Sequence, residues 1–379
     1  MKRTEHVEQD KRNMRKRKQT KIPLDYTLIM LIVILVVFGL VMIYSTSYYT
    51  ATSKYGDPAH WVIRQGIFAA VGLVAMIGVS FFDYHKFWKW SLWFYIVVNV
   101  ALVYVLFFGV ESNGARRWIG FGSFTIQPSE IAKLMIILCY AKLLSININR
   151  LSNWRVAVVI SLVMAVTVGL VGIENLSTAI ILSAIIAIML YVASSKFKSV
   201  LAVGVIAVIG GLVLLFLSGK AYRLARVTNF LDESEEVYQT QQSLYAIGSG
   251  GLLGKGLGQS LQKLGFVPEA HNDMIFSIIC EELGFVGAIG VILLYLTLLK
   301  RMYKIAIEAK DVYGALIVVG SMAHIGVQVF VNLGVVTDSI PNTGVPLPFI
   351  SYGGSSIVFL LIEMGVVLSV ARTVPKEGS

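Results

Sequence analysis

The sequence predicts an all-α polytopic membrane protein with about ten transmembrane helices. Two bulk properties point to this fold class: 56% of the 379 residues are hydrophobic, and only 14% are charged. A soluble domain carries roughly 25% charged residues, and a mean hydropathy of +0.75 leaves too little polar surface for water. The third observation is the length of the apolar runs, because about 20 apolar residues cross about 30 Å of hydrocarbon.

Each predicted element follows from these runs. Residues 1–22 form a basic tail that is too highly charged to build a core, and we expect it to be disordered and cytoplasmic. The apolar run at 24–44 is long for a signal peptide and lacks a small-residue cleavage site, so it is predicted to remain as the first span. Further spans are predicted at 61–81, 88–108, 129–146, 154–173, 177–194, 197–217, 275–299, 312–336 and 350–371. A single transmembrane domain therefore covers 23–373, followed by a cytoplasmic tail at 374–379.

Loop charges set the predicted orientation, because Lys and Arg are retained in short cytoplasmic loops. With the first tail inside, every inside loop is basic and both termini are cytoplasmic. The large extracellular loop, 218–274, lies between helices 7 and 8, and 109–128 is a short outside loop with two arginines. Basic residues of the large loop are Lys220, Arg223, Arg226, Lys255 and Lys263. A long loop is exported regardless of its charge. These five residues can therefore have a functional role or be ordinary loop residues without one, and the two interpretations stay equally open.

Composition also excludes several classes of function. Most of the net charge of +10 lies in the tail and the inside loops, so nucleic-acid binding is not needed to explain it. Cys139 and Cys280 sit in apolar runs and are expected to be small packing residues. The five histidines are scattered without zinc-site spacing. Arg223, Arg226 and the acidic run 232–236 suggest short amphipathic helices on the outer surface.

The short outside loop and the helix after it form one candidate site. Proline suits the first turn of a helix, so Pro128 marks a helix start, where the helix dipole attracts anions. Arg116 and Arg117 would add bidentate phosphate donors. Lys133 lies one turn from Glu130, and two interpretations stay open: a residue that faces a cavity, or an ion pair that satisfies both side chains.

A glycine-rich segment at 248–258 superficially suggests a phosphate-binding loop. A Walker A match fails, because aligning Gly254 and Lys255 puts Ser249 where glycine is required and Gly256 where Ser or Thr binds magnesium. No predicted strand precedes the segment either. We therefore expect a tight, flexible extracellular loop.

Asp273 lies where a polar segment meets the apolar run at 275–299. Such an aspartate is either a helix cap worth ~1 kcal/mol or a carboxylate held at the membrane boundary and suited to proton abstraction. The sequence favours neither, although Glu269 and His271 nearby make a polar cluster more probable than an isolated cap.

Residues 337–356 are too rich in proline for a helix and too apolar for a free loop. Three of the eight prolines fall within 341–348. Irregular backbone at membrane depth is tolerated where protein buries it or where it lines a cavity, so we expect a partly re-entrant wall of an outward-facing pocket. His324, Gln328 and Asn332 on the preceding helix either face this pocket or form interhelical hydrogen bonds.

Taken in this order, these segments resemble the SEDS family of bacterial membrane proteins, which includes FtsW, RodA and SpoVE, and most of all its FtsW/SpoVE branch. The resemblance covers the chain after the basic tail. It rests on Ala115-Arg-Arg-Trp-Ile, Gln127-Pro-Ser-Glu-Ile-Ala-Lys133, Tyr238-Gln-Thr-Gln-Gln-Ser, Pro268-Glu-Ala-His-Asn-Asp-Met-Ile-Phe with Glu281-Glu-Leu-Gly, and Pro346-Leu-Pro-Phe-Ile-Ser-Tyr-Gly-Gly-Ser-Ser. Glu174-Asn-Leu-Ser-Thr-Ala departs from the Pro-Asp-Leu-Gly-Thr type of many RodA-like relatives, which weakens any role for a carboxylate at Asn175.

The resemblance implies a peptidoglycan glycosyltransferase that polymerises lipid II at the outer face of the cytoplasmic membrane during cell division or sporulation. It implies a class B penicillin-binding transpeptidase and other division or sporulation membrane proteins as partners, and enrichment at the division septum. Asp273 becomes the general base, with Glu269 assisting, and a divalent cation (Mg²⁺ or Mn²⁺) is left open. Candidate substrate-binding residues are Arg116, Arg117, Trp118, Gln127, Ser129, Glu130, Lys133, Gln242, Lys263, His271, Ser351 and Ser355.

Two other classes of function compete with the polymerase. A lipid II flippase also needs a lipid-accessible cavity with arginines for pyrophosphate, and a scaffold that recruits a transpeptidase needs no catalytic residue. A transporter, however, should use sites accessible from both sides of the membrane. The polar residues instead cluster on the predicted outer side, which favours the polymerase.

Overall fold

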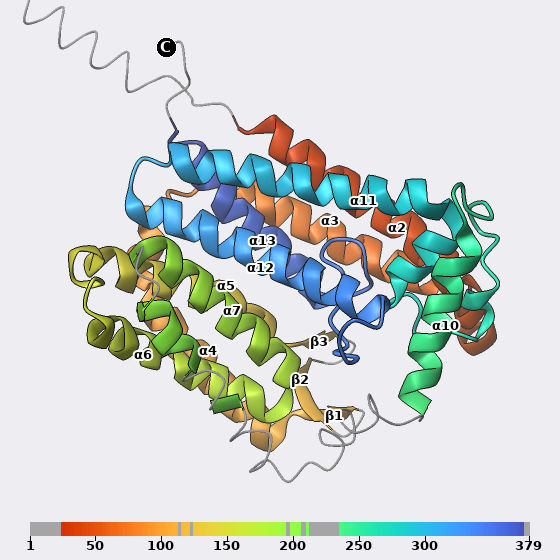
Figure 1. The fold of residues 1–379 in the computed structure, drawn as a ribbon, viewed down its shortest axis with the longest axis horizontal. Helices are drawn as coiled ribbons and strands as arrows, with labels where there is room; N and C mark the ends of the chain where they lie inside the picture. The colour runs from red at the N-terminus through yellow and green to blue at the C-terminus, as the bar shows by residue number, and fades with distance from the viewer. Residues whose placement is uncertain are drawn as a thin grey trace, which may run out of the picture.

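The computed structural model describes residues 24–112, 115–121, 124–194, 198–205, 210–211 and 235–374. Its long helices run side by side in one bundle, except α10, which lies across one end of it (Figure 1). They are α2 (Tyr26–Tyr55), α3 (His60–Ser80), α4 (His85–Phe108), α5 (Pro128–Ile146), α6 (Trp154–Glu174), α7 (Leu176–Ser194), α10 (Glu235–Gly250), α11 (Ile275–Glu308), α12 (Val312–Val336) and α13 (Ser355–Ala371). Two short 3-10 turns, η1 (Ile148–Arg150) and η2 (Gln262–Leu264), lie between them.

Seven of these helices are long and apolar enough to cross a membrane: α2, α3, α4, α6, α7, α11 and α12. Two more predicted spans are helical but fall short of that criterion. α5 carries the charged residues Glu130, Lys133 and Lys142, and α13 is only 17 residues long. The polytopic all-α prediction is therefore confirmed, whereas the count of ten is not.

Several predicted segments lie outside the described residues. The span expected at 197–217 is described only at 198–205 and 210–211, which are helical. The basic tail 1–22, the proposed amphipathic region from Arg223 to residue 234, and residues 375–379 are likewise not described.

Contacts between helix ends agree with the predicted alternation of loops. At one end Arg301 pairs with Asp25 at 2.6 Å, and His85 lies 2.9 Å from Asp311. Both contacts join segments that the charge pattern assigns to the inside. The outside segments meet at the opposite end, where Ser45 of α2 contacts Glu282 of α11.

Three helix boundaries differ from the predictions by five residues or more, and the large outer loop contains a helix longer than expected. α2 continues to Tyr55, beyond the expected end at residue 44, and stops where Gly56 takes a left-handed conformation. α13 starts at Ser355 rather than residue 350, because the backbone before it is irregular. α11 runs to Glu308, past the expected 299. The helix in the large outer loop, α10, extends to Gly250.

The outside loop at 109–128 also differs, because it folds as a small sheet. Three antiparallel strands, β1 (Val110–Ser112), β2 (Ala115–Phe121) and β3 (Phe124–Ile126), lie in the order β1-β2-β3. The strands give the arginines of β2 a defined backbone rather than a free loop.

The most enclosed span is α12, which packs against α5, α7, α11 and α13. Close packing requires a small residue at Gly320, where an added Cβ would lie 2.8 Å from side-chain atoms of Ile137 and Met189. This contact brings the polar residues of α12 toward the first turns of α5. α12 thereby connects the segments that carry the candidate site residues.

Candidate active site

Asp273 lies in the turn that leads into α11, with its side chain buried. The N-cap of α11 is Met274, which makes no capping hydrogen bond through its side chain. Asn332 of α12 holds the turn by donating hydrogen bonds to the carbonyl oxygens of Asp273, at 2.7 Å, and Val345, at 2.9 Å. Asp273 is therefore not the N-cap residue, and the alternative of a carboxylate held at the boundary is favoured.

The irregular segment 341–354 forms a wall beside this turn, as the proline pattern predicted. Gly344 has φ +65°, and a Cβ added there would lie 3.9 Å from Oδ2 of Asp273. Gln328 donates to the carbonyl oxygen of Pro346 at 2.9 Å, and the backbone N–H of Tyr352 donates to the carbonyl oxygen of His271 at 2.9 Å. Two polar residues of α12, Asn332 and Gln328, thus anchor the segment through its carbonyl oxygens, and Gln328 also lines the cavity described next.

The same segment also lines a cavity that contains a buried ion pair. Lys133 Nζ lies 2.9 Å from Glu130 Oε1, and Ser356 donates to Glu130 Oε2 at 2.6 Å. Both charged side chains line the cavity together with His324, Gln328, Ser351 and residues 346–349. The two interpretations of Lys133 therefore both apply, since the lysine is paired and also faces a cavity.

The two arginines of β2 lie at a second pocket, next to the end of α6. The backbone N–H of Arg116 donates to Glu174 Oε2 at 2.9 Å, and Arg117 Nε donates to the Glu174 carbonyl oxygen at 3.1 Å. Both arginines line this pocket with Ser129 and Asn175. Because Ser129 and Glu130 are adjacent in the first turn of α5, that turn separates the arginine pocket from the lysine cavity.

Four other predicted residues surround these pockets. Trp118 follows Arg117 on β2 and is half-buried. Gln127 precedes α5 and donates to Ser129 Oγ at 2.9 Å. Ser351 accepts from the Leu347 N–H at 2.8 Å, and Ser355 begins α13. The structure therefore gathers these residues around the start of α5 and the wall.

A cluster of aromatic rings that sequence reasoning missed covers the turn before Asp273. His271 stacks on Trp61 of α3, with ring centroids 5.2 Å apart, and Tyr352 packs edge-on against Trp61 at 4.8 Å. Burial lowers the pKa of His271 to about 4, so the imidazole is neutral at pH 7. Gln65, one turn further along α3, accepts from the N–H groups of Gly353 and Gly354. The sequence did contain one signal for this contact, because Gln65 is a polar residue within the apolar run at 61–81.

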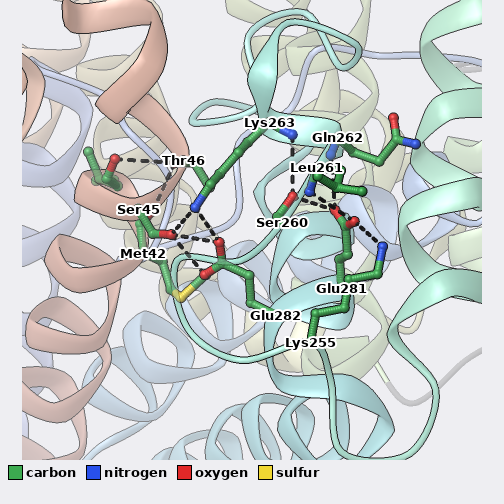
Figure 2. A network of polar contacts seen from close by, with 11 residues as sticks. Met42, Ser45, Thr46, Lys255, Ser260, Leu261, Gln262, Lys263, Glu281 and Glu282 are labelled. Atoms are coloured by element: carbon green, nitrogen blue, oxygen red, sulfur yellow. Dashed lines mark hydrogen bonds and ion pairs between the residues drawn. The ribbon is translucent and has the colours of Figure 1, made fainter.

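Three predicted residues lie apart from this grouping. Glu269 is exposed, has φ +49°, and accepts from Asn272 Nδ2 at 2.8 Å. Gln242 is half-buried on α10. Lys263 is buried in a separate network, where it pairs with Glu282 at 2.7 Å (Figure 2). The ammonium group of Lys263 is thus already used within the protein.

The arrangement can support acid-base chemistry next to an anion site. The buried Asp273 carboxylate lies beside the wall at Gly344, and residues 346–349 of the wall line the lysine cavity. Cationic side chains close to a base are the groups needed to activate a hydroxyl and to stabilise a leaving anion. Within the described part of the chain, no three His, Cys, Asp or Glu side chains group together as metal ligands would.

Comparisons with known proteins agree with this arrangement. Residues 26–376 match the family profile FTSW_RODA_SPOVE, described as cell cycle protein. The chain is 40% identical over 356 residues to stage V sporulation protein E of Bacillus subtilis, covering 92% of this chain and 97% of that protein. It is 36% identical over 358 residues to a probable peptidoglycan glycosyltransferase FtsW of a Geobacter species, covering 92% and 96%.

Two solved structures share the fold over nearly the whole chain. A chain of a peptidoglycan synthase complex is 29% identical with a TM-score of 0.76, covering 93% of this chain and 98% of that one. The rod shape determining protein RodA of Thermus thermophilus is 28% identical with a TM-score of 0.69, covering 94% and 99%.

Proposed function

The chain belongs to the FtsW/RodA/SpoVE family of cell cycle proteins, in the FtsW/SpoVE branch, and on that premise we propose that it is a peptidoglycan glycosyltransferase that polymerises lipid II at the outer face of the cytoplasmic membrane. The observation that carries the proposal is the position of Asp273. Its buried carboxylate borders the same irregular segment that also lines the Lys133 cavity. The proposed base and the proposed anion site thereby share one segment at the predicted outer side.

The proposed chemistry is a displacement at the donor sugar. Asp273 accepts the proton of the acceptor 4-hydroxyl as the oxygen attacks the anomeric carbon of the donor. A new glycosidic C–O bond forms, the bond to the pyrophosphate oxygen breaks, and undecaprenyl pyrophosphate leaves with inversion. Arg116, Arg117 and Lys133 stabilise the charge on the leaving pyrophosphate.

Other groups support binding in this proposal. The aromatic cluster of Trp61, His271 and Tyr352 offers apolar ring surfaces beside the base, where a sugar ring can pack. Ser351 and Ser355 lie along the wall and contribute hydroxyl groups. Glu269, Gln127, Ser129, Gln242 and Trp118 remain proposed contributors around the two pockets.

We also propose a partner and a location. A structural relative is a chain of a peptidoglycan synthase complex that coordinates polymerization with crosslinking. A class B penicillin-binding transpeptidase is therefore the proposed partner of this multi-pass membrane protein. The similarity to FtsW and SpoVE proteins supports the division or sporulation septum as the proposed site of action.

The decisive test is glycan synthesis from purified lipid II with the reconstituted protein and its transpeptidase partner. Asp273→Asn should lower strand formation by a factor of about 100 or more, as expected for loss of a general base. Asp338→Asn is a matched control, because Asp338 is an exposed carboxylate in the turn between α12 and the wall, and Asn tolerates its φ of +55°. Full polymerisation by Asp273→Asn would refute the assignment of the base.

The same preparation separates the two competing functions. Translocation of labelled lipid II across liposomes without any polymer would support a flippase. A scaffold predicts that no purified combination of the chain and a transpeptidase forms polymer, and that Asp273→Asn is silent in cells.

A further inference from the structure

The glycine-rich segment Gly250–Gly258, called the glycine loop below, completes a break inside α11. Gly284 interrupts the helix with φ +66° and ψ −167°. The carbonyl oxygens of Glu281 and Glu282, which lose their helical donors there, accept from the N–H groups of Lys255 and Gly256, both at 2.9 Å. The glycine loop is therefore not the flexible loop that its composition predicted.

The hydrogen bonds run in the other direction as well. The N–H of Phe285 donates to the Gly251 carbonyl oxygen at 2.9 Å, and the N–H of Val286 donates to the Leu252 carbonyl oxygen at 3.2 Å. Four main-chain hydrogen bonds thus replace the missing turn of α11. Such satisfaction by protein is what allows non-helical backbone to exist at membrane depth.

The fit depends on glycine at the points of closest approach. A Cβ on Gly254, which has φ +78°, would lie 2.2 Å from the Glu282 carbonyl oxygen. A Cβ on Gly250 would lie 2.0 Å from the Cys280 carbonyl oxygen. The backbones of the glycine loop and α11 are therefore in direct contact, and this contact fixes where the loop lies along α11.

Two ion pairs to buried glutamates of α11 also hold this part of the chain (Figure 2). Lys255 Nζ lies 2.7 Å from Glu281 Oε1. Lys263 Nζ lies 2.7 Å from Glu282 Oε1 and donates to Ser45 Oγ of α2 at 3.0 Å. Both glutamates are fully buried, so their charges are compensated inside the protein.

The depth of the break in the membrane follows from the opposite end of α11. Arg301 and Asp25 form an ion pair at the predicted inner boundary. Glu282 precedes Arg301 by 19 residues, or about 28 Å at 1.5 Å per residue, which is close to the thickness of the hydrocarbon layer. Phe285 precedes Arg301 by 16 residues, or about 24 Å, so Phe285 lies inside the hydrocarbon near its outer edge.

The surface of the glycine loop at this depth is apolar. Leu252 and Leu253 are 72% and 80% exposed in the isolated chain, and Leu257 is also exposed. They continue the exposed stripe of α11 that starts with Phe285 and Val286, the two residues to which the glycine loop is hydrogen-bonded. A span in a bilayer presents such a stripe to lipid, so the leucines extend a lipid-facing surface.

We propose that the glycine loop is a re-entrant anchor that inserts Leu252, Leu253 and Leu257 among the acyl chains at the edge of the outer leaflet. Main-chain bonds to the broken turn of α11 remove the obstacle to burying its backbone in lipid. The paired charges of Glu281 and Glu282 lie at the hydrocarbon edge, where the headgroups begin. The insertion does not depend on the chemistry assigned to Asp273.

The test measures depth with a fluorescent label on the full chain in lipid nanodiscs. Cys139 and Cys280 are replaced by Ala, and the resulting cysteine-free chain reports background labelling. The environment-sensitive NBD group is then attached to Leu253→Cys. Two matched positions bracket it. Ser53→Cys lies at an exposed position of α2, beyond Ser45. Leu293→Cys lies at an exposed position of α11, about 12 Å deeper in the membrane than Phe285.

Two quenchers give opposite readings. Dithionite in water should reduce the label at position 53 quickly, at position 253 several-fold more slowly, and at position 293 slowest. Lipid with a nitroxide near its headgroup should quench position 253 most, and lipid with a nitroxide near the chain terminus should quench position 293 most.

Reduction at position 253 as fast as at position 53, without nitroxide quenching, would overturn the proposal and place the loop in water. Protection from dithionite without quenching by either lipid would also overturn it, because protein and not lipid would then cover the leucines.

Discussion

Removing one partner of the Lys263–Glu282 pair should destabilise the protein far more than removing both. Lys263 Nζ contacts Glu282 at 2.7 Å and Ser45 at 3.0 Å, and Ser45 in turn donates to both Glu282 oxygens at 2.7 and 2.8 Å. The side chains are 8% and 0% exposed. Lys263→Met keeps the length of the aliphatic chain and leaves the Glu282 carboxylate with the Ser45 hydroxyl as its remaining side-chain donor.

The magnitude follows from the burial of both charges. Breaking a buried pair from one side costs about 3–5 kcal/mol, whereas replacing both partners by apolar residues is often neutral or stabilising. We therefore expect Lys263→Met to lower the free energy of unfolding by about 3 kcal/mol and Lys263→Met with Glu282→Leu to lie within about 1 kcal/mol of wild type. In the double variant the Ser45 hydroxyl can bond to a carbonyl oxygen of its own helix.

The measurement is SDS-induced unfolding in mixed micelles, followed by far-ultraviolet circular dichroism. Lys304→Met is the control, because it breaks a lysine–glutamate pair on the same helix that is solvent-exposed, with Nζ of Lys304 3.5 Å from Glu308. Exposed pairs of this kind contribute about 0.3–0.5 kcal/mol. The reasoning fails if Lys263→Met behaves like Lys304→Met, or if the single and double variants are equally unstable.

Three further outcomes are expected. Lys133→Met should lower both stability and glycan synthesis, and adding Glu130→Gln should restore stability but not synthesis; recovery of both would make the pair structural. Gly254→Ala should lower the unfolding temperature much more than Gly251→Ala, because both have positive φ but only Gly254 has backbone atoms in the path of a Cβ; equal shifts would argue against the loop contact. The pKa of His271 falls from 6.5 to about 4 in the folded state, so the unfolded chain binds more protons between these values. Wild type should therefore lose stability as pH drops from 6.5 toward 4, and His271→Phe should lose less; parallel curves in thermal unfolding would contradict the shift.

The spans were predictable because one physical requirement dominates them. The predicted range 312–336 coincides with α12, and 154–173 differs from α6 by one residue. Apolar length alone fixes such segments in a bilayer. The strands at 110–126 were missed because their mixed sequence lacks a strong period, and their structure depends on contacts with α4 and α6. Helix α10 begins in the acidic run for which short amphipathic helices were suggested, but its extent to Gly250, where it packs against α11, was not predicted.

The break in α11 was hidden for a different reason. Gly284 is one glycine in an apolar helix, and glycine is frequent in membrane spans. The partner that makes the break tolerable lies some 30 residues earlier, in a segment whose own composition resembles a free turn. Neither segment alone contains the signal, because the four hydrogen bonds join backbone atoms that any sequence possesses.

The structure distinguishes basic residues of the outer segments that the sequence alone could not, because it shows which of them pair with buried glutamates. Lys255 and Lys263 were equally compatible with a bland loop and with an anion site, and each proves to compensate a buried glutamate of α11. Moving either lysine to a bound pyrophosphate would leave Glu281 or Glu282 unpaired in the interior, at a cost of several kcal/mol. Arg116 of β2 carries no such obligation, because its side chain is 46% exposed and its contact to Glu111 is 3.6 Å. Among the residues proposed to meet the leaving pyrophosphate, Arg116 is therefore the cation that can do so at least cost, whereas Lys133 pairs with Glu130 at 2.9 Å and carries the same obligation as Lys263.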